Sequence, residues 1–438
     1  MSRYAVAGAG LTGALLAARL GQAGHDVTVH ERRDDPRRGP RGEGRSINLA
    51  LSTRGLDALE RVGLADHVRA RAVPMRARLI HAVDGTLTRQ PYGTTPAEHL
   101  LSVDRDELGV TLIDLADASP RTQLRFAERV HGIDLTSDSG RVGYGVAAAD
   151  AGSHHADALF AADGAFSGVR RDLADRGLMV DEVTAISHGY KELTIAAGTD
   201  GTHRLEPEVL HIWPRGTHML IALPNTDGSF TATLFWPHEG PVSFGSVTPA
   251  DVTRVFAELF ADAAQAIGDD LAEQYEANPA SGLVSVRTAP WNVDDRVVLV
   301  GDAAHAVVPF YGQGANAALE DVTLLCDLLA DGGRGDAFTA FSRRRVDTDA
   351  LASLAMDNFV EMRDHVGSRW FLVLAALRRM AHRLAPRYYV PLYTMVTFTR
   401  IPYSRARRRA RRQDALAVTA ATVLCAAVTA VIVAVVRR

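Results

Sequence analysis

The stretch that decides the fold is Tyr4-Ala5-Val6-Ala7-Gly8-Ala9-Gly10-Leu11-Thr12-Gly13, at the start of the chain. Its apolar beginning predicts a buried strand over residues 4–9, and its glycines open a predicted helix that runs to about Gly21. A second apolar run predicts a strand over residues 26–31. A strand, a glycine turn, a helix and a strand in this order are typical of the first unit of a dinucleotide-binding α/β domain.

The spacing of Gly8, Gly10 and Gly13 fits a turn that holds a pyrophosphate. The first glycine permits the tight bend, the second lets the backbone approach the ligand, and the third allows close helix–strand packing. The second strand ends on Glu31, where a carboxylate can accept hydrogen bonds from ribose hydroxyls. A purely structural glycine turn would leave Glu31 unexplained. The motif alone does not distinguish FAD from NAD(P), because both share the adenosine end.

Composition narrows the class of protein. The 438 residues exceed the usual size of one hydrophobic core, and 47% hydrophobic with 23% charged residues is typical of a packed globular chain. A formal net charge of −4 gives no reason to expect nucleic acid as a partner. Two cysteines and no metal-like Cys/His spacing indicate metal-free chemistry in a reducing compartment. The N-terminus leaves no room for a signal peptide, so we expect a cytoplasmic globular part.

The order of segments predicts two interleaved sub-domains. Helix-like and strand-like segments alternate to about Ala162, as in an α/β domain with a mostly parallel sheet. Three short strands over 210–214, 218–223 and 229–235 then form a predicted antiparallel meander. A strand at Val297–Val300 returns the chain to the α/β layer, and residues 317–385 are mainly helical. The meander is therefore expected to be an insertion within the first fold.

Two later segments resemble motifs of the flavoprotein aromatic hydroxylases. Asp163-Gly164-Ala165-Phe166-Ser167-Gly168-Val169-Arg170 is similar to their Asp-Gly segment, and residues 300–316, beginning Val-Gly-Asp-Ala-Ala-His-Ala, are similar to their Gly-Asp segment. The resemblance implies FAD as the cofactor, with Asp302 near the ribityl chain and the helix from Gly314 directed at the isoalloxazine ring. Glycine or proline breaks before that helix expose N–H groups that suit an electron-rich flavin edge. His305 is interpreted as a structural turn residue.

The pattern and the resemblance together predict an α/β fold with an FAD-binding Rossmann-like domain, an inserted antiparallel-sheet substrate domain and a helical C-terminal region, and the pattern alone predicts a C-terminal transmembrane helix. The predicted boundaries are 1–180 and 286–345 for the FAD-binding domain, 181–285 for the substrate domain, 346–404 for the helical substrate-covering region and 405–438 for a basic segment with the anchor. Further FAD contacts implied by the family are Arg32, Ala50, Arg105, Val130, Ala315 and Asn316. Gly168 and Tyr311 depart from the family's side chains, which leaves the polar contacts there open.

Other segments resemble the branch of this family whose substrate is L-kynurenine. They include Pro74-Met75-Arg76-Ala77-Arg78, Pro91-Tyr92-Gly93-Thr94, residues 356–363 and residues 391–398. The resemblance implies that Arg78 and Tyr92 hold the substrate carboxylate and that Asn358 and Tyr393 complete the pocket. A guanidinium and a phenol are suitable donors for a carboxylate. Without the resemblance, Arg78 would be interpreted as a surface arginine and the other three as packing or capping residues.

The implied reaction is hydroxylation of L-kynurenine at C3 with NADPH and O2, through a flavin C4a-hydroperoxide, in tryptophan degradation or NAD biosynthesis. No catalytic side chain is expected, because the flavin carries the chemistry and the protein positions the ring and excludes water. Two alternatives remain open at the level of the sequence. One is a related flavin hydroxylase of another aromatic acid, and the other is a non-oxygenating FAD-binding sensor or scaffold at a membrane.

The C-terminal tail has its own pattern. Six arginines lie between Arg405 and Arg412, and residues 415–436 carry no charge. About 20 apolar residues suffice to cross a bilayer, and flanking basic residues favour the cytoplasmic side. The pattern predicts membrane association through residues 415–436, although alanines and threonines make a buried or oligomer-forming helix an alternative.

Overall fold

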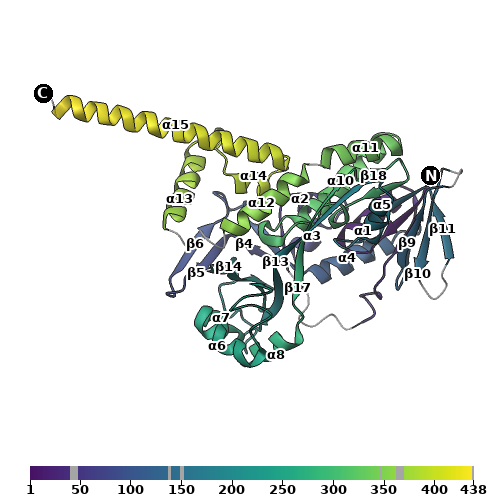
Figure 1. Ribbon diagram of the computed structural model, residues 1–438, viewed down its shortest axis with the longest axis horizontal. Helices are drawn as coiled ribbons and strands as arrows, with labels where there is room; N and C mark the ends of the chain where they lie inside the picture. The colour runs from purple at the N-terminus through teal and green to yellow at the C-terminus, as the bar shows by residue number, and fades with distance from the viewer. Residues whose placement is uncertain (40–47, 137–139, 148–151, 346, 362–368, 437–438) are drawn as a thin grey trace.

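The computed structural model describes the chain except residues 40–47, 137–139, 148–151, 346, 362–368 and 437–438. Within the helices, the side chains of 369–372, 375, 418, 420–428 and 430–436 also lie outside the description. Most side chains of the predicted anchor over 415–436 therefore fall outside the described residues. The described part contains two main sheets and a group of C-terminal helices (Figure 1).

The first sheet has six strands in the order β18-β19-β12-β1-β2-β8. They are β1 (Arg3–Ala7), β2 (Asp26–His30), β8 (Thr122–Arg125), β12 (Ala158–Ala161), β18 (Asn292–Val293) and β19 (Val297–Leu299). All pairs are parallel except β18 with β19. The helices α1 (Leu11–Gln22), α4 (Arg105–Asp117) and α10 (Gly314–Asp331) accompany it. The predicted strand–helix–strand unit is confirmed, and β1 ends earlier than expected because Gly8 adopts a φ of +97°.

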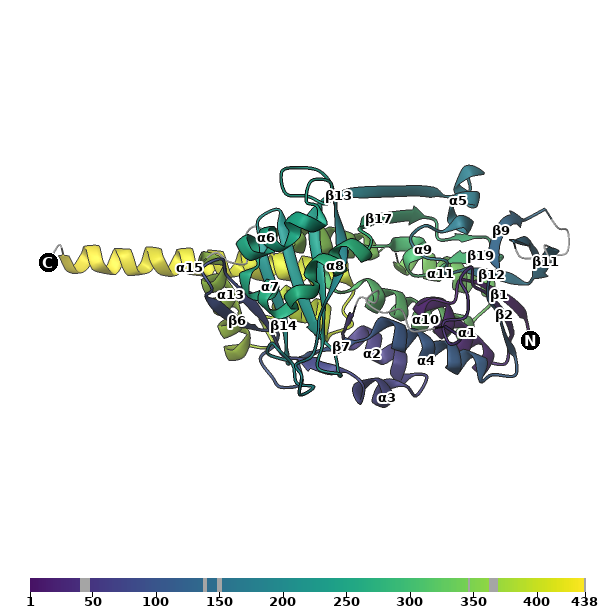
Figure 2. The ribbon, with the colours of Figure 1, turned by 90° about the horizontal axis from the view of Figure 1, so that it is seen from below.

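The second sheet has seven strands in the order β17-β13-β16-β15-β14-β5-β6. The predicted meander is confirmed as β14 (Val209–Arg215), β15 (His218–Pro224) and β16 (Phe230–Pro237). The long strand β13 (Val180–Ile195) and β17 (Ser281–Ala289) extend the sheet toward the first one (Figure 2). One face packs on α6 (Pro249–Leu259), α7 (Ala261–Ile267) and α8 (Leu271–Ala277) through a core of leucine, phenylalanine and tryptophan side chains.

The pairing of β5 (Ala77–His81) and β6 (Leu87–Pro91) corrects one expectation. Helix and strand segments up to Ala162 were expected to build a mostly parallel sheet, yet β5 pairs in parallel with β14 and in antiparallel with β6. This hairpin therefore forms the edge of the second sheet. Residues 77–91 therefore belong to the second sheet, although they precede most of the first sheet in the sequence. The predicted domain boundaries remain predictions.

The described residues also form two three-stranded sheets and several short helices. A three-stranded sheet contains β3 (Leu49–Leu51), β7 (Leu100–Val103) and β4 (Val73–Met75), and another contains β9 (Arg129–Asp134), β10 (Val142–Ala147) and β11 (Gly152–Ala156). The remaining short elements are α2 (Thr53–Glu60), α3 (Ala65–Arg69), α5 (Gly168–Asp175), α9 (Asp302–His305), α11 (Arg334–Arg345), η1 (Gly268–Asp270) and η2 (Pro309–Tyr311).

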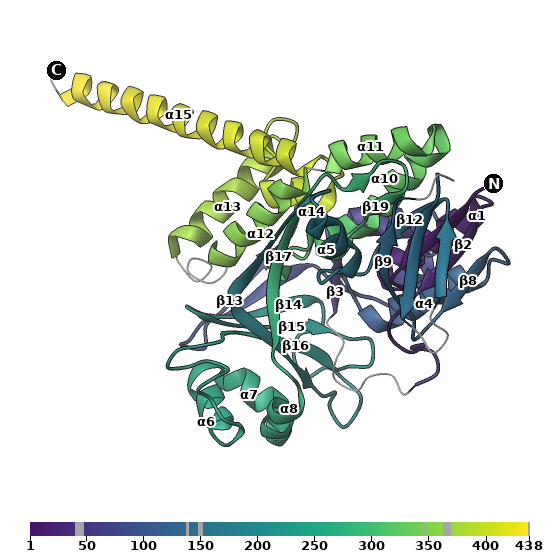
Figure 3. The same ribbon diagram turned by 45° about the vertical axis from the view of Figure 1, so that its right-hand side comes forward.

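The C-terminal helices cover the second face of the seven-stranded sheet (Figure 3). They are α12 (Thr348–Val360), α13 (Arg369–Leu384), α14 (Leu392–Phe398) and α15 (Tyr403–Val436). The start of α15 is buried through Tyr403 and Ala406, and its far end projects from the body (Figure 1). Among the described residues, no helix combines the length and the apolar composition that crossing a membrane requires. The transmembrane helix predicted over 415–436 is thus not confirmed.

Candidate active site

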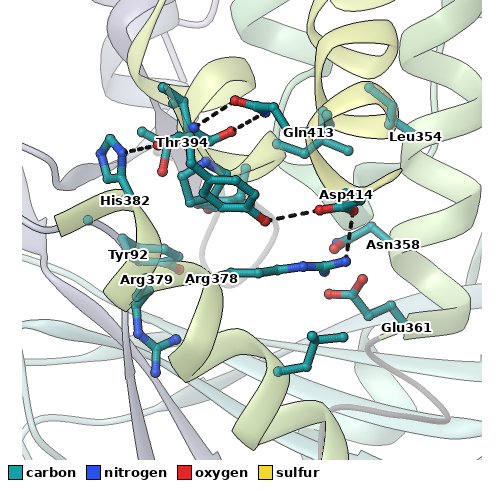
Figure 4. Close-up of a pocket in the computed structure, with 18 of the residues that line it drawn as sticks. Tyr92, Leu354, Asn358, Glu361, Arg378, Arg379, His382, Thr394, Gln413 and Asp414 are labelled. Atoms are coloured by element: carbon teal, nitrogen blue, oxygen red, sulfur yellow. Dashed lines mark hydrogen bonds and ion pairs between the residues drawn. The ribbon is translucent and has the colours of Figure 1, made fainter. Parts of the chain in front are cut away.

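A cavity of about 370 Å³ lies where the β5–β6 hairpin meets η2 and the C-terminal helices (Figure 4). Its lining includes all four side chains that the sequence assigned to the substrate: Arg78, Tyr92, Asn358 and Tyr393. These residues are separated by up to 315 positions along the chain, yet the fold brings them together. The structure therefore creates one polar-walled pocket from segments that the sequence could not join.

Arg78 lies on β5, Tyr92 directly follows β6, and both side chains line this cavity. Arg78 is only 8% exposed, and its guanidinium carbon lies 4.7 Å from the ring centre of Tyr393 and 5.6 Å from that of Tyr92. Within the described residues, Nε of Arg78 and Oη of Tyr92 are buried without a hydrogen-bond partner. Buried donors of this kind are costly unless a ligand or water accepts from them. The pair is consequently suited to an anionic oxygen ligand.

The charge of Arg78 is maintained despite burial. Desolvation by burial disfavours the charged form, but the fields of Tyr393, Tyr92 and Glu361 outweigh it, and the pKa of Arg78 lies above its ordinary value. Burial raises the pKa of Tyr92 and of Tyr311, so both phenols stay neutral hydrogen-bond donors. The inner wall of the cavity thus presents one cation and neutral hydroxyl groups.

The aromatic rings of the cavity are stacked in series. Tyr393 lies between Tyr92, at a centroid distance of 5.5 Å, and Tyr311, at 5.6 Å. Asn358 donates from Nδ2 to the main-chain oxygen of Phe310, at 2.6 Å, beside Tyr311. The cavity is therefore connected through η2 to the loop that precedes α10, the predicted flavin-facing helix.

The glycine turn at the other end of the protein has the shape that a dinucleotide needs. A Cβ on Gly8 would lie 2.5 Å from the carbonyl oxygen of Ala162, and one on Gly13 would lie 1.9 Å from that of Gly8. Both places accept only glycine. A Cβ on Gly10 would meet nothing within 4 Å, so the backbone there faces open space. This arrangement fits a pyrophosphate approaching Gly10 at the start of α1.

Two buried carboxylates flank this turn. Oε2 of Glu31 accepts from the N–H of Ala9 at 2.9 Å, and Oε1 accepts from the N–H and the Nε of Arg33 at 3.0 Å each. Burial opposes ionisation, but these donors outweigh it and hold the pKa of Glu31 below its ordinary value. The sequence did not assign Asp163 a role, although its Oδ1 is buried without a partner in the described part of the chain and its backbone adjoins Gly8.

The Gly-Asp segment is fixed from behind by a buried ionic cluster. Oδ2 of Asp321 accepts from the N–H of Gly301 at 3.0 Å and contacts Nε2 of His305 at 2.6 Å. The Nε of Arg345 lies 2.5 Å from the other oxygen of Asp321. Asp302 is left exposed at the first position of α9, and His305 also stacks on Trp291, in keeping with its predicted structural role.

The other predicted flavin contacts are only partly gathered by the fold. Asn316 binds the backbone on both sides, donating to the oxygens of Ala50 and Gly312 and accepting from the N–H of Ser52. Gly314 and Ala315 form the first turn of α10, as expected. Val130 is buried, whereas Arg32 and Arg105 are exposed at the surface. The structure therefore places Ala50 and residues 312–316 side by side, whereas among the described residues no contact joins Arg32 or Arg105 to this group.

Several cavity residues received no role from the sequence, among them Tyr311, Glu361 and Arg378. Tyr311 stacks on Tyr393, Glu361 lies one helical turn beyond Asn358, and Arg378 pairs with Asp414. The signal available for Glu361 was its spacing from Asn358, because residues three apart share one face of a helix. Arg378 gave no signal, since α13 contains several arginines and only the fold shows that Arg378 and Arg379 line the cavity.

Residues 2–343 match the family described as FAD binding domain. A protein of Myxococcus xanthus named kynurenine 3-monooxygenase is 44% identical over 91% of this chain and 86% of its own length. A protein of Salinispora arenicola with the same name is 46% identical over 94% and 91%. The crystal structure of a 2-methyl-3-hydroxypyridine-5-carboxylic acid oxygenase mutant superposes with a TM-score of 0.68 at 24% identity, covering 86% of this chain and 98% of its own, which supports the fold alone.

Proposed function

Because this chain belongs to the kynurenine 3-monooxygenase family of FAD-binding proteins, we propose that it hydroxylates the aromatic ring of L-kynurenine at C3, with NADPH and O2 as co-substrates. The relatives of that name match nearly the full chain, including the β5–β6 hairpin and the C-terminal helices that line the cavity. The proposal is therefore more specific than a shared cofactor domain would permit.

One observation carries the assignment of the substrate site. The Nε of Arg78 and the Oη of Tyr92 are buried at the inner end of a polar cavity and have no acceptor among the described residues. A substrate carboxylate would satisfy both donors, and its pairing with a buried guanidinium is a strong, charge-assisted interaction. We assign Arg78 and Tyr92 to the carboxylate, and Asn358 and Tyr393 to the walls that orient the rest of the molecule.

The glycine turn and its neighbours would hold the cofactor. Gly8, Gly10 and Gly13 would admit the pyrophosphate at the start of α1, and Glu31 would bind the ribose hydroxyls. Asp302, Ala50 and residues 314–316 would hold the flavin end, with Arg32, Arg105 and Val130 as further contacts. Bound FAD supplies the oxygen-activating redox chemistry after reduction by NADPH.

The chain itself would bind the substrate, orient its aromatic ring and exclude water from the site. With the carboxylate fixed at Arg78, the aniline ring would point toward η2 and the start of α10. The hydrogen bond from Asn358 to Phe310 holds the wall of the substrate cavity against η2 on that side. The stacked rings of Tyr92, Tyr393 and Tyr311 provide an aromatic wall along that path. Such positioning lowers the barrier without an acid–base side chain at the ring.

The decisive test is turnover by the purified yellow protein. L-Kynurenine should accelerate NADPH oxidation, and mass spectrometry should detect a product heavier by one oxygen with the 3-hydroxy retention time. NADPH oxidation that yields only hydrogen peroxide would contradict the proposal. A panel of other aromatic acids would reveal a different preferred substrate, and a flavoprotein that oxidises no NADPH would indicate a sensor or scaffold.

We also propose that the C-terminal region attaches the protein to a membrane. Residues 415–436 are uncharged and follow six arginines, as a basic segment beside an apolar anchor would be. Supporting this, α13 exposes Val373, Leu377, Met380 and Leu384 at helical spacing on one side. The globular part would then be held at the cytoplasmic face.

Vesicle sedimentation with and without residues 415–438 tests this attachment. Cutting after Asp414 preserves its bonds to Arg378 and Tyr389 and so leaves the cavity wall intact. We expect the full chain to sediment with vesicles containing phosphatidylglycerol and the shortened chain to bind them less. A full chain that stays in the supernatant without detergent and binds no vesicles would refute the attachment.

A further inference from the structure

A chain of hydrogen bonds fastens the end of β5, the strand that carries Arg78. It runs from Asp262 on α7 through His81, the last residue of β5, to His211 on the neighbouring strand β14. We propose that His81 carries a proton on both ring nitrogens and, through this chain, positions β5 so that Arg78 meets the substrate carboxylate. The inference rests on the proposed function, and it makes His81 a positioning residue for that reaction.

All four imidazole nitrogens of the chain have a close polar neighbour. Nδ1 of His81 lies 2.5 Å from Oδ2 of Asp262, and its Nε2 lies 2.9 Å from Nδ1 of His211. Nε2 of His211 lies 2.8 Å from the main-chain oxygen of Glu206. His81 is 4% exposed and His211 is 1% exposed, so water cannot readily replace these partners. Each nitrogen must therefore find its hydrogen or its acceptor within the chain.

The hydrogen bonds require one proton more than two neutral imidazoles and a carboxylate contain. A main-chain oxygen only accepts, so Nε2 of His211 must donate to Glu206, and a neutral His211 then has a bare Nδ1 that can only accept from His81. The carboxylate of Asp262 likewise only accepts, so Nδ1 of His81 must donate as well. The additional proton therefore resides on His81, on His211 or on Asp262.

The environment of the two neighbours places the additional proton on His81. Burial opposes ionisation of Asp262, but hydrogen bonds from His81 and from Nε1 of Trp213, the latter at 2.8 Å, outweigh it and lower its pKa to about 2. Burial lowers the pKa of His211 to about 4. Both groups therefore lack the proton at neutral pH. The ring of His81 also stacks on Trp213 at a centroid distance of 4.1 Å, which favours a cation there.

The chain acts on Arg78 through the short strand that Arg78 and His81 share. The two residues are three positions apart, so their side chains lie on opposite faces of the sheet, Arg78 in the cavity and His81 toward α7. β5 pairs with β14 over four residues, and its other neighbour, β6, is the edge strand. The main-chain oxygen of His81 accepts from Arg215 at 2.8 Å. His81 therefore fixes the end of a strand that has few other attachments.

His81→Asn tests the positioning role. Asparagine is uncharged and too short to bridge Asp262 and His211, so the chain is broken while Arg78 itself is unaltered. KM for L-kynurenine should rise on the order of tenfold, with kcat and flavin content close to those of the wild type, because only the placing of the carboxylate is affected. Asp262→Asn, at a carboxylate that is 47% exposed, should give a smaller rise and decides the matter if His81→Asn does not fold. An unchanged KM in the folded variants would overturn the inference.

A double substitution shows whether His81 acts through Arg78. In Arg78→Lys the guanidinium geometry is already lost, so adding His81→Asn should raise KM by at most roughly twofold more. If the effects of the two substitutions simply multiply, His81 acts elsewhere and the inference is wrong.

The matched control is His218→Asn, on β15 of the same sheet. His218 is a part-buried histidine whose Nε2 bonds to the main-chain oxygen of Val242 at 2.8 Å. Its replacement should lower thermal stability without raising KM. An equal rise of KM in His218→Asn would mean that general loosening of the sheet, and not the chain at His81, is responsible.

Imidazole NMR measures the protonation state of His81 without any substrate. In protein with isotope-labelled histidine, the resonances that disappear in His81→Asn should show hydrogens on both ring nitrogens at neutral pH, and Asp262→Asn should shift them toward the neutral pattern. A neutral His81 in the wild type would overturn the inference and leave the proposed function intact. A wild type that neither binds nor hydroxylates L-kynurenine would instead reject the proposed function and the positioning role with it, whatever the charge of His81.

Discussion

Asn358 and Phe310 are joined by a hydrogen bond of 2.6 Å, from the side-chain Nδ2 of the former to the main-chain oxygen of the latter. The bond ties α12, in the predicted substrate-covering region, to η2, which lies shortly before α10, the predicted flavin-facing helix. The ring of Phe310 also stacks on Phe359, the next residue of α12, at 4.0 Å. The proposed substrate contacts and the proposed flavin contacts are therefore mechanically linked at one place.

Asn358→Ala should disturb both sides of this link. Removing the amide leaves the oxygen of Phe310 buried without its donor, which costs about 1–3 kcal/mol. We expect a KM for L-kynurenine raised roughly tenfold and more hydrogen peroxide per NADPH oxidised, because the ring is less well placed. Steady-state kinetics with product and peroxide quantified together provide the measurement. Unchanged KM and unchanged peroxide yield would show that the link has no functional role.

Arg78→Lys examines whether geometry or charge binds the carboxylate. Lysine keeps the charge but cannot form two parallel hydrogen bonds or stack on Tyr393 as a guanidinium does. KM for L-kynurenine should rise on the order of 10- to 100-fold in Arg78→Lys and further in Arg78→Ala. The flavin absorbance of both variants should equal that of the wild type. An unaltered KM in Arg78→Ala would exclude Arg78 from the site.

Tyr92→Phe isolates a single hydroxyl group. The phenylalanine ring can still stack on Tyr393, so the wall of the pocket is preserved and only the donor Oη is lost. A single hydrogen bond to a charged group contributes about 1.5–3 kcal/mol, which predicts a rise in KM of roughly 10- to 100-fold. Because Oη of Tyr92 lacks a protein partner in the described residues, thermal stability should not fall. A drop in the melting temperature with normal KM would indicate a structural hydroxyl instead.

The glycine turn could be predicted from the sequence pattern, whereas the substrate pocket could not. The glycine turn and Glu31 were predictable because they are local: strand, turn, helix and acid follow one another within 31 residues. The pocket was not, because Arg78 depends on β5 leaving the first sheet to pair with β14. No alternation pattern within residues 77–81 signals which sheet the strand joins. Family resemblance supplied those residues, whereas local physics alone favoured a surface arginine.

Glu31→Gln should change both FAD retention and the acid limb of the stability profile. The pKa of Glu31 is lowered in the folded protein, so its ionised form stabilises the fold above its unfolded pKa, and this contribution is lost as the pH falls through the folded value. Thermal melts should show less acid destabilisation below about pH 4.5 in the variant. Dilution followed by flavin fluorescence should show faster FAD release. Full flavin occupancy after dilution would contradict the assignment of Glu31.

Glu192 provides the opposite pH dependence. Burial raises its pKa to about 7, against the favourable charge of Arg105. A raised carboxyl pKa means that the folded state binds more protons than the unfolded state between pH 4.5 and 7, so this group destabilises the fold as the pH rises through that window. Glu192→Gln should stabilise the protein at pH 8 by about 1–2 kcal/mol, discounted for partial solvation, and hardly at pH 4. Equal melting temperatures for Glu192→Gln and the wild type at pH 8 would refute the predicted destabilisation by Glu192.

The β5–β6 hairpin has a consequence for the order in which the protein becomes competent. Its strands emerge from the ribosome early, but β14, on which β5 pairs, is synthesised more than a hundred residues later, and Asn358 and Tyr393 later still. A nascent chain can therefore contain the glycine turn long before the residues that line the substrate cavity have been synthesised. Until the last helices are synthesised, a growing polypeptide would lack a complete substrate cavity. Translation of roughly the final eighty residues would supply the missing walls.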